Sequence, residues 1–188
     1  MIKSTQDKKG LSSSKLRALK LACIKSAQNR SAKRNNVIQK SKDVDIVDIK
    51  RAISKRDLLM LGVGLYWGEG YKNGNSEFGF TNSDPEMIKV YLRILRDIYN
   101  IKDEQLVLKI NINKLFIDNQ STIEKYWQKI TKISKQQFTR TTVIQSKLNK
   151  KYNIDGYKGT IRIKVKRGEF LKTRILESIN EICRIIDN

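Results

Sequence analysis

The chain has 188 residues and a formal net charge of +20 at pH 7, from 39 lysines and arginines against 19 aspartates and glutamates. A balance this basic favours a polyanionic partner, whether DNA, RNA or an anionic membrane surface. The absence of histidine excludes zinc sites built from cysteine and histidine, and also Ser-His and Cys-His catalytic pairs. No apolar stretch reaches the roughly 18 residues needed to span a membrane.

The N-terminal arm, which we bound at residues 1–50, carries much of this charge. Its first 42 residues hold twelve basic residues and one acid. A basic helix is predicted over residues 13–34 by a narrow apolar stripe at helical spacing, which consists of Leu16, Leu19, Cys23 and Ala27. Such a helix either contacts nucleic-acid phosphates or forms a solvated, partly disordered tail. A membrane-surface helix is disfavoured because the stripe lacks tryptophan and phenylalanine.

A helix begins the body of the chain, which we place at residues 54–188. Ser54 and Asp57 fit a capping box, in which the two residues hydrogen-bond each other's backbone N–H at a helix start. The helix continues through LLMLGVGLYWGEG, residues 58–70, although each glycine inside a helix costs up to about 1 kcal/mol relative to alanine. Repeated glycines at this cost indicate a use for the bare backbone.

A strand and a second helix follow. The alternation in SEFGFTN (76–82) predicts a strand with Phe78 and Phe80 on one face. SDPE (83–86) fits another capping box, with proline in the first turn of the helix that it starts. The apolar side of that helix consists of Ile88, Tyr91, Leu92, Leu95 and Ile98.

The rest of the body predicts three more strands and two more helices. QLVLKINI (105–112) and GTIRIKVK (159–166) alternate apolar and polar residues without a break, and FTRTTVIQ (138–145) is rich in β-branched residues. One helix precedes residue 138 and another ends the chain. Their apolar residues are Ile123, Trp127, Ile130 and Ile133 in the first, and Leu171, Ile175, Ile179, Ile182 and Ile186 in the second.

The two alternating strands share an arrangement that favours nucleic-acid binding. One face of each is aliphatic and suits a covering layer of helices, and the other face carries Lys109, Asn111, Arg162, Lys164 and Lys166. An antiparallel sheet can leave one face to solvent, and a β-ribbon can enter the major groove. There arginine and lysine contact guanine and phosphate, and asparagine pairs with adenine. The alternative is an ordinary solvated strand face.

More basic residues lie near the third predicted strand. The loop that follows it carries four lysines and opposes them with Asp155 alone. We therefore add Arg140, Lys150 and Lys151 to the candidate DNA contacts, together with Lys72 after the first body helix.

The glycines of the first body helix leave a groove without side chains. Four residues at helical spacing lie on one face, namely Leu61, Gly64, Leu65 and Gly68. A groove of this kind lets another backbone approach closely, so two copies of the helix could pack across a twofold axis. Each Glu69 would then lie beside its twin. Two carboxylates at close quarters repel unless a cation lies between them, and the hard cation that suits oxygen ligands beside phosphate is Mg²⁺.

GVGLYWGEG, residues 62–70, resembles the nine-residue motif of the LAGLIDADG homing endonucleases. Gly64 and Gly68 fall on the small helix-packing positions of the motif. Glu69 falls on its metal-binding acid, and Gly70 on its closing glycine.

The similarity extends beyond the motif. GLYWGEG (64–70) followed by FTNSDPEMIK (80–89) resembles a group of single-motif LAGLIDADG-like proteins of bacteria and archaea. Many relatives in that group carry an N-terminal helix-turn-helix, and we expect this chain to begin after such a segment. The order of elements matches over residues 54–186. The chain departs from the motif at Gly62, where the family has its first leucine, and at Trp67, where the family has another common acid.

The resemblance implies a compact α/β (α+β) domain of the LAGLIDADG type. Its twisted antiparallel sheet, with flanking helices, would form a saddle on double-stranded DNA. One motif per chain implies a homodimer and a roughly palindromic DNA site. The basic N-terminal helical arm would stand beside this domain.

The implied chemistry is Mg²⁺-dependent hydrolysis of DNA phosphodiester bonds, with a metal-bound water as the nucleophile. Glu69 and Gly68 would hold the metal. Lys109 and Lys164 are the candidates for stabilising charge in the transition state, and Lys72 is a loop-borne rival.

Other functions fit some of the same features. A non-catalytic, LAGLIDADG-derived regulator would also bind DNA, and only Glu69 separates it from an endonuclease. An RNA-binding protein is disfavoured because the basic strands carry almost no aromatic residues. Cys23 and Cys183 stand alone, which predicts reduced thiols and a cytoplasmic protein that associates with the nucleoid when it is bound to DNA.

Overall fold

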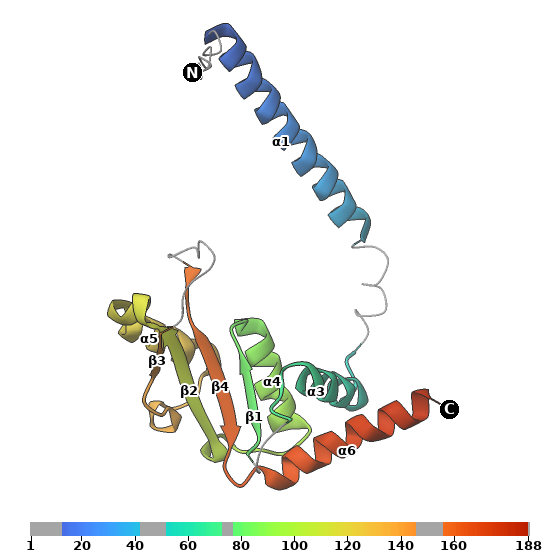
Figure 1. Ribbon diagram of the computed structural model, residues 1–188. Helices are drawn as coiled ribbons and strands as arrows, with labels where there is room; N and C mark the ends of the chain where they lie inside the picture. Colours follow the sequence, from blue (N-terminus) through green and yellow to red (C-terminus); the bar gives the residue numbers. More distant parts are fainter. Residues whose placement is uncertain (1–12, 42–51, 73–76, 146–155, 188) are drawn as a thin grey trace, which may run out of the picture. The chain divides into compact units, whose positions relative to one another are not determined.

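The computed structural model divides into two compact units, Met1–Ile53 and Ser54–Asn188. The residues that the structure describes are 13–41, 52–72, 77–145 and 156–187 (Figure 1). Lys150 and Lys151, predicted as DNA contacts, lie outside these ranges.

Within the first unit the structure describes a single helix, α1 (Ser13–Ser41). It begins at the predicted residue and continues past the predicted end at residue 34. Its sequence contains no acidic residue, and every side chain described in it is exposed. The helix therefore buries no apolar side against other described residues. It lacks the burial of an apolar face that usually stabilises a helix in a protein.

Helix α3 (Lys55–Glu69) opens the second unit with the predicted capping box. The Asp57 N–H donates to Ser54 Oγ at 3.2 Å, and the Ser54 N–H donates to Asp57 Oδ2 at 2.8 Å. The Asp57 carboxylate accepts hydrogen bonds from the side chain and the backbone N–H of Ser54. These bonds, of which the side-chain bond has the larger effect, hold the pKa of the Asp57 carboxyl below its usual range. The helix ends at Gly70, whose N–H donates to the Tyr66 carbonyl at 2.8 Å.

Four strands and six helices or short helices make up the rest of the described part of this unit. In chain order they are β1 (Gly79–Asn82), α4 (Pro85–Asp97), the short helix η1 (Asp103–Gln105), β2 (Leu106–Asn113), η2 (Lys114–Asn119), α5 (Gln120–Thr131), η3 (Lys135–Gln137), β3 (Thr142–Ile144), β4 (Thr160–Val165) and α6 (Glu169–Ile186). Of the helices in the described ranges, none combines the length and apolarity needed to cross a membrane.

The four strands form one mixed sheet in the order β1-β4-β2-β3 (Figure 1). Strand β4 pairs antiparallel with β1 and with β2, whereas β2 and β3 are parallel, with Asn111 opposite Thr142. The prediction of an antiparallel sheet is therefore wrong at this edge. The reason is that α5 carries the chain back to the end of the sheet at which β2 began, so that β3 runs in the same direction.

One face of the sheet packs against helices and forms the core. The residues predicted on the aliphatic faces of β2 and β4 are all buried, namely Leu106, Leu108, Ile110, Ile112, Ile161, Ile163 and Val165. Phe78 and Phe80 are buried beside them, and Phe80 stacks on Tyr91 of α4 with ring centroids 3.9 Å apart. Helix α3 packs against α4 and α6. The mixed α/β architecture with flanking helices agrees with the prediction.

The start of α4 differs from the predicted capping box. Asp84, and not Ser83, is the N-cap residue, and its Oδ1 accepts a hydrogen bond from the Glu86 N–H at 2.9 Å. Pro85 occupies the first turn, as predicted. Aspartate caps as effectively as serine, so the helix starts one residue later than the box would place it.

Two further boundaries shift near the parallel edge. The strand predicted over 138–145 shortens to β3, and Phe138 contributes only an isolated bridge to Leu108. Helix α5 ends at Thr131, and Ile133 reaches the core from beyond the left-handed backbone of Lys132. Periodicity alone did not reveal this break in the helix.

Candidate nucleic-acid interface

The sheet face opposite the core gathers four of the predicted DNA contacts. Strand register places Lys109 of β2 opposite Arg162 of β4, and Asn111 opposite Thr160. Lys164 lies further along β4, between β1 and β2. We call this surface the polar sheet face and define it by Tyr71, Glu77, Thr81, Lys109, Asn111, Thr160, Arg162 and Lys164.

Arg162 is held in place by its neighbours. Its guanidinium lies over the Tyr71 ring, 4.3 Å from the centroid, and the hydroxyls of Tyr71 and Thr81 are hydrogen-bonded at 3.1 Å. The Tyr71 N–H donates to the Gly79 carbonyl at 2.8 Å, which joins the segment after α3 to β1. A planar guanidinium restrained in this way loses little further freedom when it binds a flat, bidentate partner.

Glu77 neutralises part of this surface. Its Oε2 accepts a hydrogen bond from Lys164 Nζ and lies 3.6 Å from Arg162 Nη2. The hydrogen bond from Lys164, together with the positive charges of Lys164 and Arg162, holds the pKa of the Glu77 carboxyl below its usual range. Glu77 is not among the residues predicted for this surface, although the alternation of SEFGFTN places residues 77, 79 and 81 on one face.

Lys109 and Asn111 present the remaining polar groups of β2. Among the described residues, no carboxylate forms a salt bridge with Lys109. Asn111 Nδ2 donates to Thr160 Oγ1 at 3.4 Å, a long hydrogen bond that leaves the amide free to exchange partners. Of the two lysines in the strands β2 and β4, Lys164 pairs with Glu77, and Lys109 pairs with no carboxylate in the described part of the chain.

Three other predicted contacts are not members of the polar sheet face. Lys166 follows the end of β4 and its Nζ donates to the Glu104 carbonyl at 2.8 Å. Arg140 lines a small hollow with residues of α5, on the helix side of the sheet. Lys72 donates to the Trp67 carbonyl and so stabilises the C-terminal end of α3, where a cation complements the helix dipole.

The exposed side of α3 is apolar and has glycine at its centre. Met60, Leu61 and Trp67 are each more than 40% exposed, at 46%, 45% and 43%. A Cβ added at Gly64 or Gly68 would meet nothing within 4 Å, so the helix has no partner at these two positions within the described chain. We call this surface the glycine face and define it by Met60, Leu61, Gly64, Trp67 and Gly68. Leu65, also predicted here, is half-buried at its edge.

Glu69 is the last residue of α3, and its side chain is exposed. Among the described residues, no group of three or more histidines, cysteines, aspartates or glutamates could hold a metal ion. A hard cation could nevertheless use the Glu69 carboxylate and the Gly68 carbonyl, because the last four carbonyls of a helix have no partner within it. The donors fit Mg²⁺ in kind, but one chain supplies few of them.

The Tyr66 hydroxyl serves a structural purpose. It donates to the Tyr71 carbonyl at 2.9 Å, and burial raises the pKa of this phenol to about 12. At neutral pH it is therefore a hydrogen-bond donor and not a base. The bond ties the end of α3, and with it Glu69, to the segment that supports Arg162.

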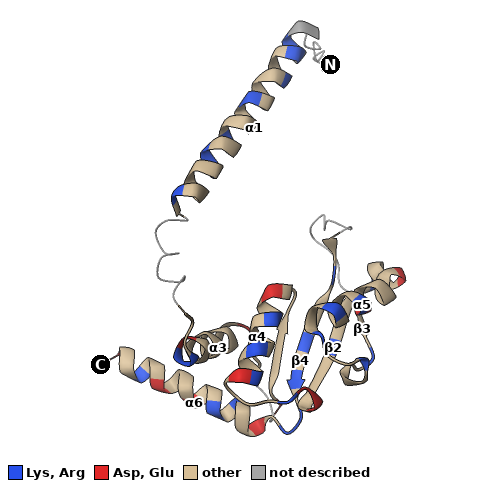
Figure 2. Ribbon diagram, turned by 180° about the vertical axis from the view of Figure 1, so that it is seen from behind, with Lys and Arg blue, Asp and Glu red and all other residues tan. Residues whose placement is uncertain are grey.

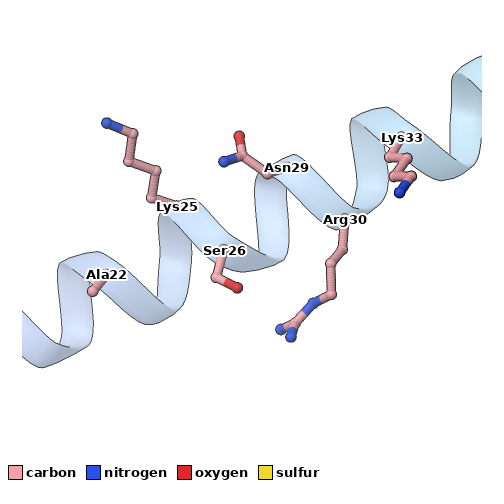
Figure 3. A pocket seen from close by; sticks show the side chains of 6 residues that line it. All are labelled: Ala22, Lys25, Ser26, Asn29, Arg30 and Lys33. Carbon is pink, nitrogen blue, oxygen red and sulfur yellow. The ribbon is translucent and has the colours of Figure 1, made fainter.

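Basic residues recur along α1 without opposing acids (Figure 2). Figure 3 shows one side of the helix, where Ala22, Lys25, Ser26, Asn29, Arg30 and Lys33 border a shallow hollow. One helix supplies all of these residues, so the hollow is a strip of open surface. Small residues between the cations leave the helix backbone accessible to a partner.

No family model, curated protein or solved structure matches the chain.

Proposed function

We propose that the unit Ser54–Asn188 binds double-stranded DNA on the polar sheet face and, as a homodimer joined through α3, hydrolyses phosphodiester bonds with Mg²⁺. The observation that carries the proposal is one helix that combines the exposed glycine face with an exposed terminal carboxylate, Glu69. Contiguous apolar surface of this kind is typical of an interaction site. The resemblance of residues 62–70 to the LAGLIDADG motif points to the same assignment.

Charge supports DNA as the partner. Lys109, Arg162 and Lys164 lie together on one solvent-facing sheet surface, opposed there by Glu77. Arginine and lysine recognise guanine edges and phosphates from such a surface. The acid-free helix α1 adds basic residues that would strengthen phosphate binding without reading sequence.

The chemistry would depend on both chains of the dimer. Each chain would contribute Glu69 and the Gly68 carbonyl, so that the twofold axis gathers two carboxylates and two carbonyls as metal ligands. Bound Mg²⁺ would supply an activated water and neutralise charge on the phosphate. Lys109 is the first candidate for stabilising the transition state, since no described carboxylate pairs with it; Lys164 would first have to leave Glu77.

The experiment compares Glu69→Gln with the wild type in two assays, DNA binding without metal and Mg²⁺-dependent nicking of supercoiled plasmid. Loss of a metal ligand should remove several kcal/mol of transition-state stabilisation and slow cleavage at least about 100-fold. Binding should persist or tighten, since one negative charge near the phosphates disappears. Glu86→Gln, which breaks a surface pair with Lys89 on α4, is the matched control and should leave cleavage unchanged. If Glu69→Gln cuts as fast as the wild type, Glu69 is not a ligand.

The second candidate function is a DNA-binding protein that does not cut. The cations of the polar sheet face and the open positions Gly64 and Gly68 support it equally, and only the role of Glu69 separates it from the endonuclease. Tight DNA binding by both the wild type and Glu69→Gln, with no nicking by either, would establish this function and exclude the endonuclease.

A further inference from the structure

A hollow at the end of β4 brings basic side chains together with the Glu77 and Glu169 carboxylates. Its volume is about 460 Å³, and its charged lining residues are Lys164, Lys166, Arg167, Glu77 and Glu169. Arg162 approaches the same Glu77 carboxylate from the preceding outward-facing position of β4. Four cations thus lie at or beside a cavity that holds two carboxylates.

The Glu77 carboxylate occupies the position in which an external anion would meet these cations. A single oxygen, Oε2, accepts from Lys164 and lies 3.6 Å from Arg162. The Glu77 side chain is 61% exposed, whereas those of Arg162 and Lys164 are 23% and 27% exposed. The anion therefore lies outside the cations and can leave without disturbing the core. A phosphodiester carries the same single charge and offers oxygen acceptors of the same kind.

We propose that this hollow is a binding site for a DNA backbone phosphodiester and that Glu77 occupies it in the free protein as an internal competitor. The inference rests on the proposed DNA binding. Glu77 lowers the affinity of the protein for any DNA, because each phosphate that enters must first displace the carboxylate. Contacts elsewhere on the polar sheet face then contribute a larger share of the discrimination between DNA sequences.

The size of the effect follows from the exposure of the ion pair. An exposed ion pair such as Lys164–Glu77 changes an equilibrium constant by up to about fivefold. Removing the negative charge of Glu77 also removes its repulsion of nearby phosphates. Glu77→Gln should therefore bind a labelled 20-base-pair duplex of random sequence about 3- to 10-fold more tightly than the wild type. The slope of log K against log salt should steepen by about one unit, as expected for one additional phosphate contact.

Two controls separate a local site from a change in net charge. Glu86→Gln removes the same charge from a pair on α4 and should change affinity less than about twofold. Lys164→Gln removes the cation that donates to the carboxylate, so Glu77→Gln should tighten binding clearly less in that background than in the wild type. Glu77 is exposed and Lys164 is half-buried on the solvent-facing side of β4, so both variants should fold like the wild type.

A second probe distinguishes failure of this inference from failure of the proposed function. Inorganic pyrophosphate should raise the melting temperature of Glu77→Gln more than that of the wild type, and Lys164→Gln should reduce the difference. If this holds but neither protein binds DNA, the anion site stands and DNA binding is wrong. If both bind DNA equally tightly, or if Glu77→Gln binds more weakly, Glu77 is not a competitor and the inference is wrong while DNA binding stands.

Discussion

The four glycines of α3 and its C-cap differ in what surrounds them. A Cβ at Gly62 would lie 2.6 Å from Ile94 Cγ2, and one at Gly70 would meet the Tyr66 ring at 2.5 Å. These two glycines permit close packing within the chain. Gly64 and Gly68 face open space in the same helix, so the fold of one chain does not require them to be glycine.

This difference predicts opposite effects of two alanine substitutions. Gly62→Ala should lower the free energy of unfolding by about 1 to 2 kcal/mol, because overpacking against a branched side chain outweighs the gain in helix propensity. Gly64→Ala should raise it by up to about 1 kcal/mol, because the added methyl meets nothing. Urea unfolding at low protein concentration measures both. Equal effects at the two positions would contradict the packing described for α4.

At the scale of the element, α3 begins with the Ser54–Asp57 capping box and ends at Glu69, the candidate metal ligand. Its buried side packs on α4 and α6, and Gly64 and Gly68 of its glycine face have no partner in the described chain. The same helix is therefore a core element and a candidate interface.

Gly68→Leu tests the interface. The leucine should fit the isolated chain, where the position is open, and should separate two helices that approach through their glycines. Light scattering should show a dimer for the wild type at micromolar concentration and a monomer for the variant. Lys125→Leu, at an exposed position of α5, is the control and should remain dimeric. A monomeric wild type in the presence of DNA would exclude this interface.

The capping box predicts a pH-dependent loss of stability. Ser54→Ala should cost about 1 kcal/mol at pH 7. The pKa of Asp57 is lower in the folded than in the unfolded chain, so its stabilising bonds with Ser54 are present above the ordinary value of 3.8 and are lost as the pH falls through the lower folded value. The difference between Ser54→Ala and the wild type should therefore shrink at pH values well below 3.8. Ser83→Ala, at the residue that does not cap α4, should change stability little at either pH.

At the scale of the whole molecule, the charge is distributed over two units with different structural roles. The Ser54–Asn188 unit holds three of its basic residues, Lys109, Arg162 and Lys164, on a packed sheet, whereas α1 carries its own on a helix whose described side chains are all exposed. Phosphate contact is the common chemistry, but only the sheet fixes individual side chains such as Arg162.

Deleting residues 1–42 should therefore weaken DNA binding without changing sequence preference. If about four of the arm's basic residues neutralise phosphates, the slope of log K against log salt should flatten by about 3 to 4 units. Replacing Lys25, Arg30 and Lys33 with glutamine in the full chain should flatten it by about 2.7 units. Binding titrations at several salt concentrations measure both variants. An unchanged slope after deletion would show that the arm does not contact phosphates.

The sequence by itself determined the features that depend on neighbouring residues. The start of α3 follows from Ser54 and Asp57, and the buried faces of β2 and β4 follow from strict alternation, because capping and strand periodicity act over a few residues. Lys109, Asn111, Arg162 and Lys164 could be placed on one face for the same reason. The glycine spacing of residues 62–70 likewise identified a bare helix surface.

Only the tertiary structure decided the relations between distant segments. It made β2 and β3 parallel, assigned Gly62 to packing inside the chain and left Gly64 open. It also brought Glu77 to Lys164, which lies 87 positions away in the sequence. The physical reason is that strand pairing and cross-chain ion pairs depend on how all the helices pack on the sheet together, and no local pattern encodes that packing.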